Sequence, residues 1–118
     1  MPQIMLEHST HFDNADFRAL ALDIHHLCEV HTGATLESCK TRIVRAEDLV
    51  IADGSPAQAM VHCDLRILTG RTQEQKTALG QAVQQALVAA LTQYDGPRQI
   101  SVEIGELDKP NYHKVTAG

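Results

Sequence analysis

The chain has 118 residues, 43% of them hydrophobic, and its 15 acidic residues outnumber its 10 basic ones. This length predicts a single domain over residues 1–118, and the hydrophobic content is enough for a packed core, so the chain is not a disordered segment. The net charge of −5 argues against nonspecific binding to nucleic acid or to an anionic membrane. Because no apolar run approaches the roughly 20 residues that span a bilayer and no secretory signal opens the chain, we expect a cytoplasmic protein.

The first part of the chain predicts a strand followed by a helix. Alternation of apolar and polar residues from Gln3 to His8 is typical of a short strand. Apolar residues then recur at spacings of three and four, which predicts a helix from about Asn14 to Thr32. Asp13 and Asp16 lie at its expected start, and the glycine that follows it suits a helix end.

Two further strands are expected before the second helix. The first runs from Cys39 to Arg45 and places Lys40 and Arg42 on the same face, because alternate residues of a strand point the same way. An Asp-Gly and Ser-Pro turn follows it, and the next strand runs from Met60 to Leu68.

The second helix has the clearest signals in the sequence. Thr72 and Gln75 form a capping box that predicts its start. An apolar stripe then continues as far as Tyr94, and Gly96-Pro97 is expected to end the helix.

A last strand from Ile100 to Gly105 and a polar, irregular tail complete a β-α-β, β-α-β order. The sequence therefore predicts an α/β (α+β) fold, in which two β-α-β units form one four-stranded mixed sheet with both helices on one face. The two units, about 2–50 and 58–108, form an internal pseudo-repeat. The other face of the sheet is left bare, with apolar and charged residues mixed, so we expect it to be buried in a homo-oligomer.

The cysteines and histidines give no pattern typical of a reactive or metal site. Cys28, Cys39 and Cys63 have no CxxC spacing and are expected to be buried, reduced thiols, with a catalytic cysteine as the alternative. The seven histidines include no HExxH motif, so we expect no metal site.

Pro2 is the candidate general base. Methionine before a small residue is normally removed, so we expect a mature chain that begins with the secondary amine of Pro2. An ordinary α-amino group has a pKa of roughly 7.7–8.0. Burial and nearby cations such as Lys40 or Arg71 would lower the pKa of the Pro2 amine and make it a competent base near neutral pH.

Six short segments in a fixed order span nearly the whole chain: Pro2 with Glu7 and Ser9, Thr41-Arg42-Ile43, Ala52-Asp53-Gly54, Ala59-Met60-Val61-His62, Gly70-Arg71 and Glu103-Ile104-Gly105-Glu106-Leu107. Each segment is common by itself, but their order and spacing together are fairly specific. Through them the chain resembles the 5-carboxymethyl-2-hydroxymuconate isomerase family of the tautomerase superfamily.

The resemblance implies a homotrimer in which three sheets form a barrel with the helices outside. It implies an intramolecular oxidoreductase whose amino-terminal proline moves a proton within an unsaturated 2-hydroxy or 2-oxo acid, such as 5-carboxymethyl-2-hydroxymuconate. Cationic side chains hold the carboxylates of this small-molecule substrate, and no metal or organic cofactor takes part. The implied pathway is the bacterial breakdown of homoprotocatechuate.

The resemblance also assigns roles to individual residues. Pro2 matches the general base, and Arg71 matches the family's arginine just before the second helix. Lys40 stands where the family usually has arginine, so it offers a point charge in place of a bidentate fork. Arg42 is expected either to bind substrate or to form an intersubunit ion pair, and Tyr112 to line the pocket. The alternative functions are a phenylpyruvate-type keto-enol tautomerase, a decarboxylase and a noncatalytic trimeric binding protein.

Overall fold

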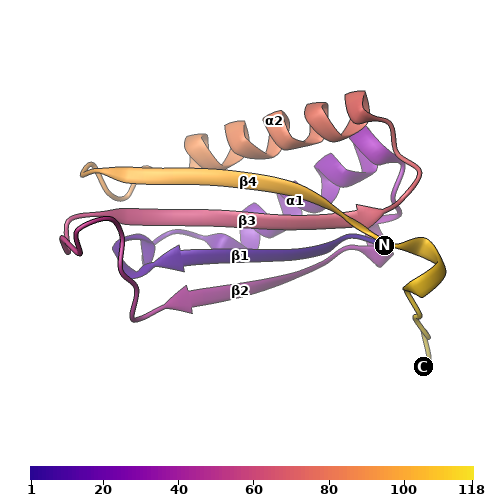
Figure 1. The fold of residues 1–118 in the computed structure, drawn as a ribbon, viewed down its shortest axis with the longest axis horizontal. Coiled ribbons are helices and arrows are strands. Elements are labelled where there is room, and N and C mark those ends of the chain that lie inside the picture. Colours follow the sequence, from indigo (N-terminus) through magenta and orange to yellow (C-terminus); the bar gives the residue numbers. More distant parts are fainter.

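The computed structural model describes residues 1–118, which form one four-stranded sheet with two helices on one of its faces (Figure 1). This arrangement confirms the predicted fold class. Neither helix is long and apolar enough to span a membrane. In chain order the elements are β1 (Gln3–Ser9), α1 (Phe17–Thr32), β2 (Lys40–Ala46), β3 (Ala59–Leu68), α2 (Gln73–Ala90) and β4 (Arg98–Leu107).

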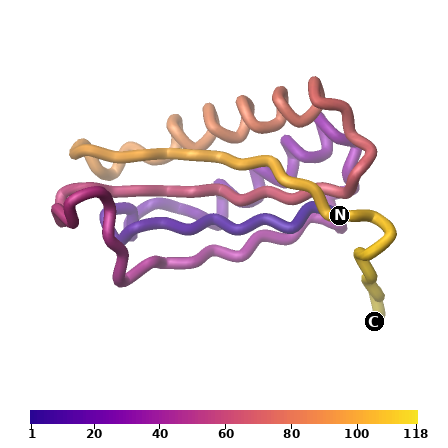
Figure 2. Tube along the Cα trace, viewed as in Figure 1, coloured from indigo at the N-terminus to yellow at the C-terminus, as the bar shows by residue number.

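The strand order is β2-β1-β3-β4. The β1–β2 and β3–β4 pairs are parallel and each is connected through one helix, as the two predicted β-α-β units require. The two units join through the antiparallel pair of β1 and β3. As a result, the start of β1 and the end of β3 lie at the same end of the sheet, where α2 begins and the carboxyl-terminal tail leaves β4 (Figure 2).

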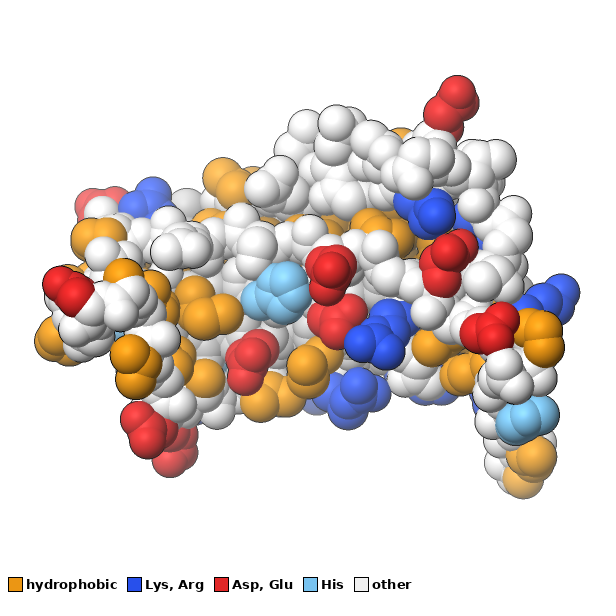
Figure 3. All heavy atoms as spheres, in the orientation of Figure 1, with side chains coloured by type: hydrophobic (Ala, Val, Ile, Leu, Met, Phe, Trp, Pro, Cys, Tyr) orange, Lys and Arg blue, Asp and Glu red, His pale blue; other side chains and the backbone are white.

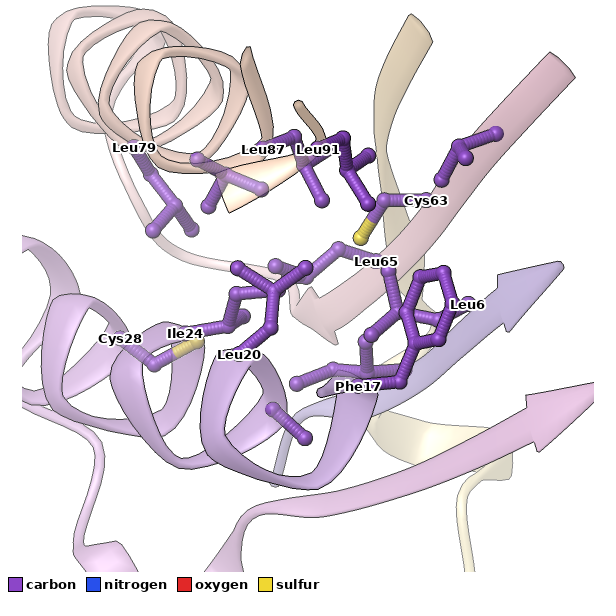
Figure 4. Packing of buried hydrophobic residues seen from close by; sticks show 14 of the residues in the cluster. Leu6, Phe17, Leu20, Ile24, Cys28, Cys63, Leu65, Leu79, Leu87 and Leu91 are labelled. Atoms are coloured by element: carbon purple, nitrogen blue, oxygen red, sulfur yellow. The ribbon is translucent and has the colours of Figure 1, made fainter. Parts of the chain in front are cut away.

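The core lies between the helices and one face of the sheet (Figure 4). Each strand of the central pair sends every second side chain into this layer, and each helix contributes its apolar stripe. Fully buried members include Leu6 of β1, Ile24 of α1, Leu65 of β3 and Leu87 of α2. Burial against a continuous layer therefore fixes which strand faces point away from the helices.

Helix α1 begins three residues later than the apolar spacing predicted. Asp16 is its amino-terminal cap, since its carboxylate accepts a hydrogen bond of 3.0 Å from the backbone N–H of Ala19. Asp13 has a different role, because both of its carboxylate oxygens accept 2.8 Å hydrogen bonds from Arg45 at the end of β2.

The capping box of α2 is confirmed, but its predicted end is wrong. Thr72 and Gln75 make the two reciprocal hydrogen bonds of the box. The helix ends at Ala90, before Gly96-Pro97, because the buried Leu91 leaves the helical conformation. Tyr94 therefore lies outside the helix, where its hydroxyl donates to the carbonyl of Ala57 in the loop before β3.

The second face of the sheet carries no helix and has the mixed character expected from the sequence. Figure 3 looks onto this face, where acidic, basic and hydrophobic side chains lie next to one another. Met5, Asp64 and Arg66 contribute to it, and His62 forms a 2.7 Å hydrogen bond with the hydroxyl of Ser101 on the neighbouring strand. We refer to it below as the open sheet face.

Candidate active site

Pro2 lies immediately before β1 and is fully buried. It continues the alternation of Ile4 and Leu6, so its ring is on the same side of the sheet as the helices. Its carbonyl accepts a 3.3 Å hydrogen bond from the backbone N–H of Lys40, which extends the parallel pairing of β1 and β2 by one residue. The backbone at the amino terminus is therefore held in place by the sheet.

Arg71 lies in the short connection between β3 and α2, at the same end of the sheet as Pro2, because Gln3 pairs with Arg66 near the end of β3. Its Nε donates a 3.3 Å hydrogen bond to the carbonyl of Thr32, the last residue of α1. The next residue, Thr72, caps α2, whose first turn presents free backbone N–H groups and the positive end of the helix dipole. The guanidinium and the helix start together favour an anion at this position.

Lys40 begins β2 and pairs directly with Gln3. Its ammonium donates a 2.7 Å hydrogen bond to the carbonyl of Ser38. The ion pairs of the chain include neither Lys40 nor Arg71, although acidic residues are in excess overall. Both cations therefore remain available to an anionic ligand.

The pKa of the α-amino group of Met1 depends on the charges and the burial at this end of the sheet. Burial lowers its pKa, and the positive charges of Arg71, Lys40 and Lys114 lower the pKa further. The structure therefore brings together three of the predicted site residues, Pro2, Arg71 and Lys40, in surroundings that favour a neutral amine.

Arg42 and Tyr112 both form hydrogen bonds with the side chain of Gln3, the residue after Pro2. Arg42 donates a 3.3 Å hydrogen bond to the Gln3 amide oxygen, and the Gln3 amide nitrogen donates a 3.0 Å hydrogen bond to the hydroxyl of Tyr112. Arg42 also lines a hollow of about 390 Å³ on the open sheet face, together with Met5 and Asp64. Arg42 is thus directed toward the open sheet face and the tail, and it is not among the cations that lower the pKa of the amine.

Lys114 is the cation that the sequence analysis missed. It lies in the tail beyond β4, and its ammonium is 3.2 Å from the sulfur of Met1. The tail has no apolar periodicity that could have predicted this position. Its only sequence signal is a positive charge two residues after Tyr112, which was expected at the pocket.

All three cysteines are free thiols, and Cys28 and Cys63 are buried as expected, whereas Cys39 is only half-buried. Burial raises the pKa of Cys28 and of Cys63 to about 12, and it also raises the pKa of Cys39. All three therefore remain protonated near neutral pH and are poor nucleophiles. The geometry does not favour the catalytic-cysteine alternative.

Solved structures show that this is the fold of the tautomerase superfamily. A 5-carboxymethyl-2-hydroxymuconate isomerase from Deinococcus radiodurans R1 aligns with a TM-score of 0.79 and 22% identity, covering 98% of this chain and 90% of that chain. A fused 4-OT wild-type symmetric trimer aligns with a TM-score of 0.72 and 27% identity, covering 93% and 89%. A second 5-carboxymethyl-2-hydroxymuconate delta-isomerase aligns with a TM-score of 0.70 and 20% identity, covering 100% and 89%.

The family model for 5-carboxymethyl-2-hydroxymuconate isomerase matches residues 2–117. The chain therefore belongs to the 5-carboxymethyl-2-hydroxymuconate isomerase family and is an isomerase. No curated protein sequence matches it.

Proposed function

We propose that this isomerase moves a proton within an unsaturated 2-hydroxy acid that carries two or three carboxylates, with the amine of Pro2 as the base. The substrate that we propose is 5-carboxymethyl-2-hydroxymuconate, which carries three. The observation that carries the proposal is the environment of the amino terminus. Pro2 is buried at the start of β1, while Arg71 and Lys40 lie close by without carboxylate partners.

The base requires a free amine at Pro2. While Met1 is present, the nitrogen of Pro2 is part of an amide and is not basic. Removal of Met1 converts this nitrogen into a secondary amine that is part of the ring of Pro2, whose side chain is buried. The burial and the positive charges that lower the pKa of the Met1 amine also favour a neutral amine at Pro2.

The reaction needs a base that carries one proton from oxygen to carbon and positive charge that stabilises the anionic intermediate. The neutral amine takes the proton of the 2-hydroxyl group, which leaves a dienolate. The resulting ammonium returns the proton to C5, at the far end of the conjugated chain, and the product is a 2-oxo acid with the remaining double bond between C3 and C4. No atom is gained or lost, and Pro2 returns to its neutral form.

Arg71 and Lys40 supply the positive charge that this path requires. Arg71 can hold a carboxylate through two hydrogen bonds, and the start of α2 adds backbone N–H groups directed at the same region. Lys40, on the strand next to β1, provides a second positive charge near Pro2. Both charges stabilise the dienolate more than the protonated substrate, because negative charge increases during the first step.

We expect the protein to convert 5-carboxymethyl-2-hydroxymuconate and to act on phenylpyruvate much more slowly, because phenylpyruvate has one carboxylate for the two cations. Ultraviolet absorbance follows the loss of the dienol, and NMR in D₂O shows whether solvent deuterium enters at C5. Equal or faster turnover of phenylpyruvate would favour the keto-enol tautomerase over the proposed substrate. The proposed reaction is a step in the bacterial breakdown of homoprotocatechuate, which we place in the cytoplasm.

We expect the protein to be a homotrimer. The open sheet face carries partly exposed apolar side chains such as Met5 and Met60 that one chain does not cover, and none of the surface hollows is lined by Pro2, Lys40 or Arg71. A trimer would bury this face and bring a neighbour to the site, and the 4-OT structure that shares the fold is a symmetric trimer. Light scattering should give the mass of three chains, whereas a stable monomer at micromolar concentration would contradict the barrel.

A further inference from the structure

The carboxyl-terminal tail crosses from the edge of the sheet to the amino terminus. After β4, the backbone N–H of Lys109 donates a 3.4 Å hydrogen bond to the hydroxyl of Thr69 at the end of β3. A single turn over Lys109–Asn111 follows, and Tyr112 then accepts its hydrogen bond from Gln3 in β1. The tail therefore passes beside the amino terminus, as Figure 1 shows.

This path places the ammonium of Lys114 at the first residue of the chain. Its ammonium contacts the sulfur of Met1 at 3.2 Å, and no ion pair of the chain includes it. Removal of Met1, which the proposed reaction requires, takes this contact away. Lys114 then becomes a third cation without a carboxylate partner beside Pro2, after Lys40 and Arg71.

We propose that Lys114 is a specificity-determining residue of this enzyme and binds the third carboxylate of a tricarboxylic substrate. The inference rests on the proposed function, because it assigns a subsite next to Pro2. Three cations face a ligand with three negative charges, in a chain whose net charge is −5. Three neighbouring cations in a chain with a net negative charge are the pattern expected at a binding site for a polyanion.

The three cations differ in how firmly they are held, which suggests how they divide the carboxylates. Arg71 is tied to α1 through Thr32, and Lys40 is tied to Ser38 at the start of β2. Lys114 extends from the exposed tail and is positioned indirectly, through the hydrogen bond between Tyr112 and Gln3. Lys114 therefore suits the carboxylate that lies farthest from the reacting carbons and contributes to substrate choice more than to the chemical step.

The test compares 5-carboxymethyl-2-hydroxymuconate with 2-hydroxymuconate, which lacks the carboxymethyl group. Lys114→Ala is expected to raise the KM of the tricarboxylate about 2- to 5-fold with little change in kcat, since an exposed charge pair contributes modestly. The preference for the tricarboxylate should fall by the same factor, and this loss should shrink as salt is added. Lys114→Arg should restore the preference, and Lys109→Ala, in the same tail, serves as the matched control.

Equilibrium binding gives a second readout that does not depend on turnover. Isothermal titration with propane-1,2,3-tricarboxylate and with glutarate should show weaker binding of the tricarboxylate alone in Lys114→Ala. The inference would be overturned if Lys114→Ala kept the wild-type preference for the tricarboxylate in both kinetics and titration. If the wild-type enzyme converts neither muconate, the proposed function fails, and the titration still decides whether Lys114 binds the third carboxylate.

Discussion

Chains that begin at Pro2 are expected to be active, whereas chains that retain Met1 should lose at least about 100-fold in kcat/KM, the lower end of what a general base contributes. The reason is chemical, because the Pro2 nitrogen is an amide in one form and a secondary amine in the other. One preparation can be separated into the two forms, with intact mass identifying each. Equal activity of both forms on the muconate substrate would show that Pro2 is not the base.

The pH dependence of the active form provides a second test of the same base. Burial and the positive charges of Arg71 and Lys40 lower the pKa of the Met1 amine, and we expect the same surroundings to lower the pKa of the Pro2 amine once Met1 is removed. The amine is reactive when it is neutral, so kcat/KM should rise with pH and level off below the ordinary α-amino range of roughly 7.7–8.0. Pro2→Ala keeps a terminal amine but makes it primary and less confined, so activity should fall without disappearing.

Replacement of Arg71 by alanine is expected to lower kcat/KM by about 10- to 150-fold. A hydrogen bond to a charged group contributes about 1.5–3 kcal/mol, and Arg71→Ala removes the guanidinium that we assign to a substrate carboxylate and the dienolate. Arg71→Lys keeps the charge and loses the bidentate geometry, so its loss should be smaller. Steady-state kinetics with 5-carboxymethyl-2-hydroxymuconate measures both variants.

Arg71 also supports the fold, so the prediction needs a structural control. Its hydrogen bond to Thr32 connects the start of α2 to the end of α1. Arg98 is a matched control, because it also donates to backbone carbonyls, those of Asp95 and Gly96, but lies at the start of β4, at the opposite end of the sheet. Urea unfolding of Arg71→Ala and Arg98→Ala shows how much stability each variant loses, so that a loss of stability can be separated from a loss of catalysis. Wild-type activity of Arg71→Ala would remove Arg71 from the site.

Most of the fold could be predicted because it depends on local patterns. Alternation identified all four strands, and parallel crossovers followed from a helix between paired strands. The end of α2 could not be predicted in this way, because Leu91 and Tyr94 continue the apolar spacing after the helix has ended at Ala90. These side chains pack against the same core from a non-helical backbone, and periodicity does not distinguish the two cases.

The candidate site could be predicted only in part, because its residues come together through strand pairing and not through spacing. Lys40 and Arg42 were expected to share a face of one strand, and both lie two residues apart in β2. Their side chains have different partners, because the ammonium of Lys40 donates to the carbonyl of Ser38 and the guanidinium of Arg42 donates to Gln3. Lys114 is more than 100 residues from Met1 in the sequence, and only the path of the tail brings them into contact.

The antiparallel junction of the two β-α-β units makes the sheet nearly two-fold symmetric in shape but not in chemistry. Turning the chain about the β1–β3 junction exchanges β1 with β3, and the core-facing Pro2 then corresponds to the core-facing Ala59, whose nitrogen is always a peptide amide. The second unit can never supply a terminal amine. With Pro2 as the proposed base, only one of the two pseudo-equivalent strand starts in each chain can react, so a trimer would contain three reactive centres where its shape suggests six.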